Sequence, residues 1–123
     1  MGMTVEQRGE EVVLVRLTGE LDISVTQSTG QRIAAAVPSS AHGVVVDMTG
    51  LEFIDSSGIS MLFGLARRVG SHRQQLRVVA PADKTVARVL EIVEFGRAAP
   101  IDPDVESAVA RLATPPEYPP PRG

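Results

Sequence analysis

Apolar and polar residues alternate along this chain with two periods, and the shorter period marks the strands. Two β-prone runs, 3–7 and 12–17, flank the polar sequence RGEE and predict a hairpin with Gly9 in its turn. The apolar run at 44–48 is typical of a buried strand, and the run at 76–81 predicts the next strand. The sequences TGELD and TGLE, which follow the second and third of these four runs, predict turns.

The longer, helical period appears after the hairpin. Ser24 and Gln27 have the spacing of a capping box and predict a helix over 25–37. Gly30 lies inside that helix, where glycine costs roughly 1 kcal/mol relative to alanine. A broad arc of apolar residues predicts a second helix over 59–70, with arginines near its end, where the helix dipole favours cations.

The C-terminal third of the chain repeats the alternation. Asp83 is the predicted cap of a helix over 86–93, whose apolar residues follow the i, i+3, i+4, i+7 stripe. Residues 96–101 predict a last short strand. Asp102 and the proline after it supply a cap and a first-turn residue for a final helix over 105–112.

Strands and helices in this order predict a single α/β domain with a small, mixed, partly parallel sheet and about four helices. The domain is predicted to span residues 1–113, and the proline-rich segment 114–123 is predicted to be a flexible tail. With 123 residues, 43% of them hydrophobic and only four aromatic, the chain can bury a continuous, mainly aliphatic core.

Charge and composition narrow the classes of partner. The net charge is −3 and no basic run occurs, so binding to nucleic acid is not expected. The chain has no cysteine, which excludes disulfides and thiolate chemistry and is compatible with a reducing cytosol. No apolar run is long enough to span a bilayer, and the N-terminus has no signal-like core. We expect a soluble, cytoplasmic protein without membrane insertion.

The sequence offers little support for catalysis. Ser56 and Ser57 lack the G-x-S-x-G setting of α/β hydrolases, and His42 and His72 stand in polar stretches typical of exposed loops. Phosphate-binding and dinucleotide-binding glycine loops are absent, as are metal-ligand spacings. We therefore predict no enzyme, no cofactor and no metal site. Folding could still bring a histidine to a serine, so a Ser–His hydrolase stays open as an alternative.

The stretch Asp55 to Gly58, DSSG, stands between a predicted strand and a predicted helix. Capping of the helix explains one such residue and stabilises a helix by about 1 kcal/mol. It leaves a surplus hydroxyl, which a kinase could modify. A phosphate of about −1.5 to −2 charges is tolerated at a helix N-terminus and changes the surface that a partner approaches. Ile59, Met61 and Phe63 are predicted to supply exposed apolar contact area there.

Three segments together resemble the STAS domain family, and most closely its bacterial anti-sigma factor antagonists. They are GELD at 19–22, VVVDMTGLEFIDSSGIS at 44–60, and the helix that follows. The resemblance runs from about Thr4 to Leu112. It implies a small mixed sheet with helices largely on one face. Two departures are Ser60, where these proteins often have glycine, and Gly30 in a helix that is usually more apolar.

The resemblance also implies a function. The serine after the motif's aspartate, here Ser56, would be phosphorylated by an anti-sigma factor that is also an ATP-dependent serine kinase; Ser57 is the second candidate. The unphosphorylated protein would bind that anti-sigma factor and release the sigma factor, as in stress-response transcription. Phosphorylation would end binding, and a serine phosphatase would restore it. The predicted partner-binding residues are Asp22, Asp55, Ser56, Ser57, Gly58, Ile59 and Met61.

A second interpretation is compatible with the same resemblance. A STAS-like domain can also act as a scaffold or sensor subunit of a larger assembly, either stressosome-like or associated with a transporter. Fold alone does not distinguish the two interpretations.

Overall fold

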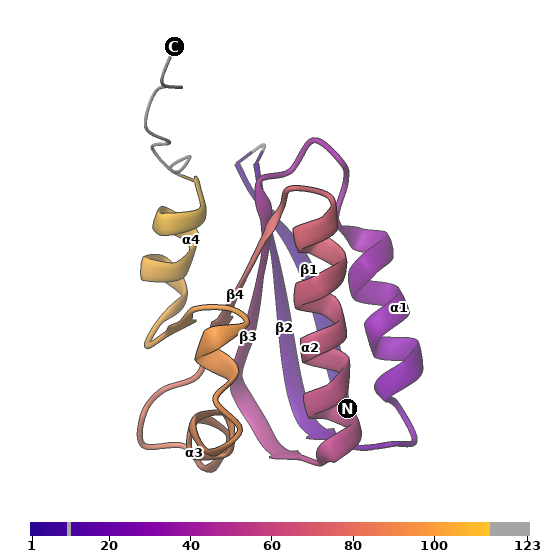
Figure 1. Cartoon of the computed structure of the whole chain (residues 1–123), viewed down its shortest axis with the longest axis vertical. Coiled ribbons are helices and arrows are strands. Elements are labelled where there is room, and N and C mark those ends of the chain that lie inside the picture. Colours follow the sequence, from indigo (N-terminus) through magenta and orange to yellow (C-terminus); the bar gives the residue numbers. More distant parts are fainter. Residues whose placement is uncertain (10, 114–123) are drawn as a thin grey trace.

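The computed structural model describes residues 1–9 and 11–113, and its strands and helices alternate along the chain (Figure 1). The elements are β1 Gly2–Arg8, β2 Val12–Leu21, α1 Thr26–Ala36, β3 Gly43–Ile54, α2 Ser56–Ser71, β4 Gln75–Val79, α3 Thr85–Ile92, a 3₁₀ turn Phe95–Arg97, β5 Ile101–Asp102 and α4 Val105–Ala113. This order confirms the predicted α/β class. The predicted tail, 114–123, lies outside the described residues.

Within the described residues, five strands form one mixed sheet in the order β1-β2-β3-β4-β5. β1 and β2 are antiparallel and form the predicted hairpin, in which Gly9 has a left-handed φ of 69°. The other neighbours are parallel, and helices make the connections between them. The carboxyl ends of β2 and β3 therefore meet at one edge of the sheet, next to the N-termini of α1 and α2.

The sheet is covered on both faces, because alternate residues of its strands point in opposite directions. One face carries Val13, Val15 and Val46 and packs against α1, α2 and α3. Figure 1 shows α1 and α2 side by side on this face. The opposite face carries Leu14 and Val45, which α4 covers. The helices thus lie largely on one face, as predicted, with α4 on the other.

β2 and β3 are longer than predicted, and the turns predicted at TGELD and TGLE are wrong. β2 continues to Leu21 and β3 to Ile54. The two extensions pair with each other, Leu21 opposite Ile54, with register shifts that Gly19 accommodates at a φ of 87°. Each extension supplies the backbone hydrogen bonds that the other needs, and this long-range pairing overrides the local preference for a turn.

The capping box predicted for α1 is also wrong. The helix begins after Val25, which makes no side-chain capping bond. The hydroxyl and the N–H of Ser24 both donate to the Asp22 carboxylate instead. Likewise Lys84, not Asp83, precedes the first residue of α3, and it makes no side-chain capping bond. Backbone bonds stand at both starts instead, from the Val25 and Thr26 N–H groups to the Asp22 carbonyl and from the Lys84 N–H to the Pro81 carbonyl.

Asp102 is not the cap of the last helix, contrary to the prediction. It ends β5 with 1% of its surface exposed, and it binds Arg77 Nε at 2.7 Å and Arg111 Nη1 at 2.9 Å. Asp104 caps α4 instead, accepting from the Ser107 N–H at 2.7 Å. The strand predicted over 96–101 is wrong except at its last residue. Pairing of β5 with β4 draws Asp102 into the interior, where two guanidinium groups stabilise its charge.

Candidate functional site

The DSSG stretch forms the junction between β3 and α2. Asp55 follows the last strand residue directly and is the N-cap of α2. One of its carboxylate oxygens, Oδ1, accepts from the Gly58 N–H at 3.0 Å and from the Ser57 hydroxyl. The backbone oxygen of Asp55 accepts from the Ile59 N–H at 3.1 Å. Asp55 therefore satisfies the first turn of the helix, as the capping interpretation predicts for one residue of the motif.

The same carboxylate joins this junction to the loop after β2. Its second oxygen, Oδ2, accepts from the Ile23 N–H at 3.0 Å, and the Asp55 N–H donates to the Leu21 carbonyl at 3.1 Å. The bonds from Ser57, Gly58 and Ile23 stabilise the charged carboxylate and hold the pKa of Asp55 below its usual value. Two loops that are more than thirty residues apart in sequence are thus fixed to each other through Asp55.

Asp22 lies in the loop that Asp55 fixes, and its contacts are internal to that loop. Its carboxylate binds Ser24, and its carbonyl accepts from the N–H groups of Val25 and Thr26 at 3.0 and 3.1 Å. Asp22 thereby shapes the turn that carries Ile23. The structure brings Asp22, Asp55, Ser56, Ser57 and Gly58 together at one end of the sheet.

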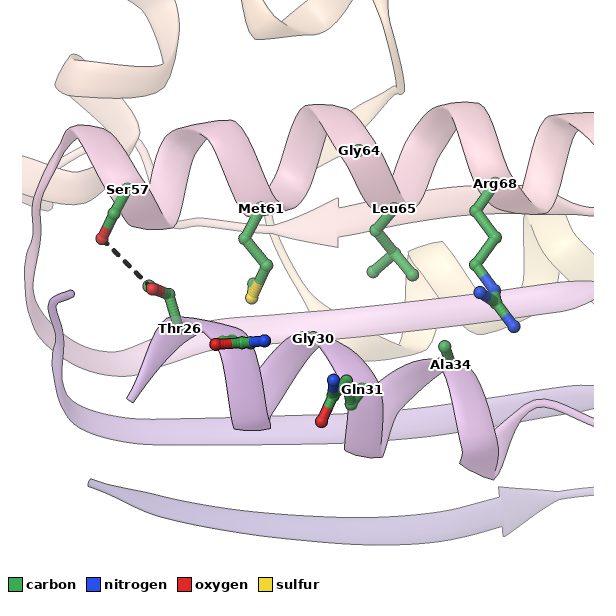
Figure 2. A pocket seen from close by; sticks show the side chains of 10 residues that line it. Thr26, Gly30, Gln31, Ala34, Ser57, Met61, Gly64, Leu65 and Arg68 are labelled. Carbon is green, nitrogen blue, oxygen red and sulfur yellow. Dashed lines mark hydrogen bonds between the residues drawn. The ribbon is translucent and has the colours of Figure 1, made fainter. Parts of the chain in front are cut away.

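The two serines of the motif have different environments. Ser57 is half-buried, and its hydroxyl donates to Asp55 and accepts from Thr26 Oγ1 at 3.3 Å. Figure 2 shows this second bond, which crosses from α2 to α1 at one end of the groove between the two helices. Ser56 is exposed, and its hydroxyl makes no hydrogen bond to another described residue. Of the two adjacent serines, Ser56 is therefore the one whose hydroxyl is accessible to an approaching molecule.

Gly58 lets the first turn of α2 pack closely against the ends of β2 and β3. A Cβ atom at this position would lie 2.7 Å from Ile54 Cγ1 and 3.1 Å from the Leu21 carbonyl oxygen. Gly30 has a similar role on α1, where a Cβ would lie 3.1 Å from Met61 Cγ. The glycine that weakens α1 in isolation therefore makes room for a side chain of α2.

The apolar contact area predicted on α2 is mostly used inside the molecule. Met61 lines the groove between α1 and α2 (Figure 2). Ile59 is partly buried against the core. Phe63 packs edge-on against Phe95, with ring centroids 5.0 Å apart. These side chains are half-buried rather than exposed, because the broad apolar arc of α2 contacts α1, the sheet and the 3₁₀ turn together. Contact of Ile59 and Met61 with a partner stays a prediction.

Two large apolar side chains are exposed in the segments on either side of this junction, and the sequence analysis did not predict them. Ile23 is 78% exposed and Phe53 is 48% exposed. A signal for Ile23 existed: it stands alone between Asp22 and Ser24, outside any apolar stripe. For Phe53 the signal was hidden, since the turn predicted just before it left its environment undefined.

The structure separates both histidines from the serines. His72 follows the last residue of α2, and 16 residues at 1.5 Å each place it about 24 Å from Ser56. His42 precedes the first residue of β3, at the opposite end of that strand. His42 is also half-buried, with Nδ1 3.3 Å from the Leu112 carbonyl oxygen. A Ser–His hydrolase site is therefore contradicted by the geometry.

The described residues hold neither a candidate metal centre nor a candidate membrane-spanning helix. In residues 1–9 and 11–113, no three His, Cys, Asp or Glu side chains gather as metal ligands would. No helix in that part of the chain combines the length and the apolar character that crossing a bilayer requires.

Comparison with known proteins places this geometry in a family. The sequence model of the STAS domain matches residues 3–108. The anti-sigma-F factor antagonist RsfA of Mycobacterium tuberculosis is 28% identical over 107 residues, which are 85% of this chain and 82% of RsfA.

Solved structures agree with the fold. An anti-sigma factor antagonist from Mycobacterium paratuberculosis superposes with a TM-score of 0.80 at 25% identity, covering 92% of this chain and 94% of that one. The Bacillus cell fate determinant SpoIIAA, solved in its phosphorylated form, superposes with a TM-score of 0.69. This chain and SpoIIAA are 23% identical, and the superposition covers 90% of this chain and 99% of SpoIIAA. At this sequence identity the likeness shows the fold alone.

Proposed function

Because this chain belongs to the STAS domain family, we propose that it is an anti-sigma factor antagonist whose binding is switched at Ser56. The unphosphorylated protein binds an anti-sigma factor that is also a serine kinase, and the sigma factor is released. Phosphorylation of Ser56 ends the binding, and a serine phosphatase restores it. The names of the relatives from two Mycobacterium species support this assignment. Its action on sigma-factor control would take place in the cytoplasm.

The free hydroxyl of Ser56 carries the proposal. In the transfer, Ser56 Oγ forms a bond to the γ-phosphorus of an ATP held by the partner, and the bond from that phosphorus to the ADP oxygen breaks. The hydroxyl proton passes to a base of the kinase. Ser57 is a poorer acceptor, because its hydroxyl is half-buried and already bonded to Asp55 and Thr26.

A phosphate on Ser56 would meet an occupied helix end. The Gly58 and Ile23 N–H groups already donate to Asp55, so the phosphate has to share this end of α2 with a carboxylate. It adds about −1.5 to −2 charges beside Asp22 and Asp55. Enclosing that charge in an interface without a counter-charge is costly, whereas exposing it to water is not. The modification can therefore abolish binding while leaving the fold intact.

The test compares baits that differ by one charge at two positions of the same helix face. Wild type, Ser56→Asp and Ser60→Asp are used to capture proteins from native extract, and bound proteins are quantified by mass spectrometry. Ser60 is the matched control, since it is an exposed serine one turn further along α2. We expect an ATP-dependent kinase to be enriched on wild type and on Ser60→Asp, and to be lost on Ser56→Asp.

A second measurement identifies the acceptor. The captured kinase, purified with ATP, should phosphorylate wild type and Ser57→Ala but not Ser56→Ala. Equal capture of the same partners by all three baits would contradict the switch. A megadalton particle on size-exclusion of the extract would then favour the scaffold interpretation.

A further inference from the structure

The side chains of Ser56 and Ser57 leave α2 in different directions. Consecutive residues of an α-helix are turned by about 100° relative to each other, because one turn holds 3.6 residues. Ser57 lines the groove between α1 and α2 and points across it to Thr26 (Figure 2). Ser56 is exposed. Two neighbouring hydroxyls of one motif therefore meet different parts of the fold.

Thr26 belongs to a part of the chain that the DSSG motif does not include. It is the first residue of α1, with 7% of its surface exposed, and its N–H donates to the Asp22 carbonyl at 3.1 Å. From this position the Thr26 hydroxyl donates to Ser57 Oγ at 3.3 Å. Thr26 thus contacts the motif from the other side of the groove, on a backbone that is itself fixed.

Thr26 and Asp55 hold the Ser57 hydroxyl from two sides. The hydroxyl donates its only proton to Asp55 Oδ1 and accepts the bond from Thr26. To attack a phosphorus atom, Ser57 has to give up a bond to a charged carboxylate, and such bonds are stronger than those between neutral groups. Asp55 does not compensate by acting as a base. The bonds from Ser57 and Gly58 lower its pKa and leave it a weak proton acceptor.

A phosphate on Ser57 would also be poorly accommodated. It would add about −1.5 to −2 charges at a half-buried side chain that is bonded to the Asp55 carboxylate. Like charges in contact repel each other, and partial burial weakens the screening of that repulsion by water. Ser56 is exposed, so a phosphate on Ser56 is hydrated. Both the attack and its product therefore disfavour Ser57.

We propose that Thr26 and Asp55 restrict phosphorylation to Ser56 by holding the neighbouring hydroxyl of Ser57 inside the fold. This inference rests on the proposed function and adds to it the cause of the choice of acceptor. Thr26 is a specificity-determining residue that acts through Ser57 and does not touch the reacting atoms. The choice between the two serines is thus made by this chain and not by the kinase alone.

The experiment removes Ser56 and measures whether Ser57 can be released. The purified kinase and ATP are incubated with saturating Ser56→Ala protein, alone or combined with Thr26→Val, Asp55→Asn or both, and the phosphorylated residue is mapped by mass spectrometry. Valine keeps the shape of threonine without its hydroxyl, and asparagine keeps the helix cap without the charge.

Transfer to a released Ser57 has the same balance as transfer to Ser56. Ser57 Oγ bonds to the γ-phosphorus, the bond from that phosphorus to the ADP oxygen breaks, and the hydroxyl proton passes to a base of the kinase. We expect the variant with both changes to accept phosphate on Ser57 about tenfold faster or more than Ser56→Ala alone. This is the effect of losing one hydrogen bond to a charged group.

Two control variants in the same Ser56→Ala background distinguish release of Ser57 from general loosening of α1. Thr26→Ser retains the hydroxyl and should leave Ser57 as slow as in Ser56→Ala alone. Thr29→Val removes a hydroxyl on the same helix that is 1% exposed but bonds to Met1 Sδ, and it should also leave Ser57 slow. A cooperative urea transition for each variant shows that it folds.

Three outcomes would overturn the inference and leave the proposed function standing, provided that wild type is phosphorylated on Ser56. The first is phosphate on Ser57 of Ser56→Ala at the wild-type rate. The second is a folded variant with both changes in which Ser57 stays as slow as in Ser56→Ala alone. The third is an equal acceleration by Thr29→Val. Wild type that accepts no phosphate on Ser56 would overturn the proposed function, and the inference with it.

Discussion

Gly58→Ala tests whether the first turn of α2 is held against the strands as closely as the site requires. The added methyl group would lie 2.7 Å from Ile54 Cγ1 and 3.1 Å from both Leu21 Cγ and the Leu21 carbonyl oxygen. Ile54 is buried, and the Leu21 carbonyl is fixed by its bond from the Asp55 N–H, so neither neighbour can move freely. The methyl group therefore forces the helix and the strand ends apart.

The magnitude follows from two opposing effects. Forcing a methyl group into a filled site costs about 1–3 kcal/mol. Replacing glycine by alanine in a helix gains at most about 1 kcal/mol. The crowding is the larger effect, and we expect Gly58→Ala to lower the free energy of unfolding by about 1–2 kcal/mol.

Gly64→Ala on the same helix provides the matched control with the opposite sign. A Cβ at Gly64 meets only Arg67 Nη2, at 3.9 Å, which is an ordinary contact. The higher helix propensity of alanine is then not opposed by crowding, and we expect the free energy of unfolding to rise by up to about 1 kcal/mol.

Urea unfolding measures both variants through the shift of the midpoint at an unchanged m-value. Thermal unfolding should agree, at about 4 °C per kcal/mol for a domain of this size. A Gly58→Ala protein as stable as Gly64→Ala would refute the close packing of α2 on the strand ends.

Two further predictions concern buried and capping carboxylates. Asp102→Ala should lower the free energy of unfolding by about 3 kcal/mol, because Arg77 is then left largely buried without its partner. In urea unfolding, the double variant Asp102→Ala/Arg77→Met should lose less free energy of unfolding than the sum of the two single changes. The lowered pKa of Asp55 means that its stabilisation is complete above its ordinary pKa of about 4 and is lost as pH falls through the lower folded pKa. The gap in urea midpoint between wild type and Asp55→Asn should accordingly be full at pH 7 and close in acid; a gap independent of pH would contradict this sign.

Asp55 explains why the motif cannot be understood from capping alone. As a cap it needs only one oxygen, and that oxygen serves Gly58 and Ser57. The other oxygen fixes Ile23, from a loop that the sequence places far away. One carboxylate thus orders the helix end, occupies the hydroxyl of Ser57 and fixes the backbone of the loop that carries Ile23.

Much of the fold could be predicted because its signals are local. The hairpin at Gly9 and the four helices follow from residues within one or two turns of each other, and all are confirmed. The match of the STAS domain model to residues 3–108 confirms the family that the motifs at 19–22 and 44–60 indicated. The largest errors lie where the deciding partner is distant, at the ends of β2 and β3, which pair with each other.

The sequence by itself determined that a strand ends in an acid and two serines before a helix, and that no cysteine or phosphate loop supports another chemistry. Only the tertiary structure decided which serine is free. Ser56 and Ser57 are equivalent hydroxyls in the sequence, yet Thr26 and Asp55 converge on Ser57 and leave Ser56 exposed. Likewise Asp102 and Asp104 look alike as caps, but the arrival of Arg77 and Arg111 makes Asp102 an interior charge. Helical and strand periods are short-range properties of the chain, whereas the environment of a polar side chain depends on partners that only folding brings together.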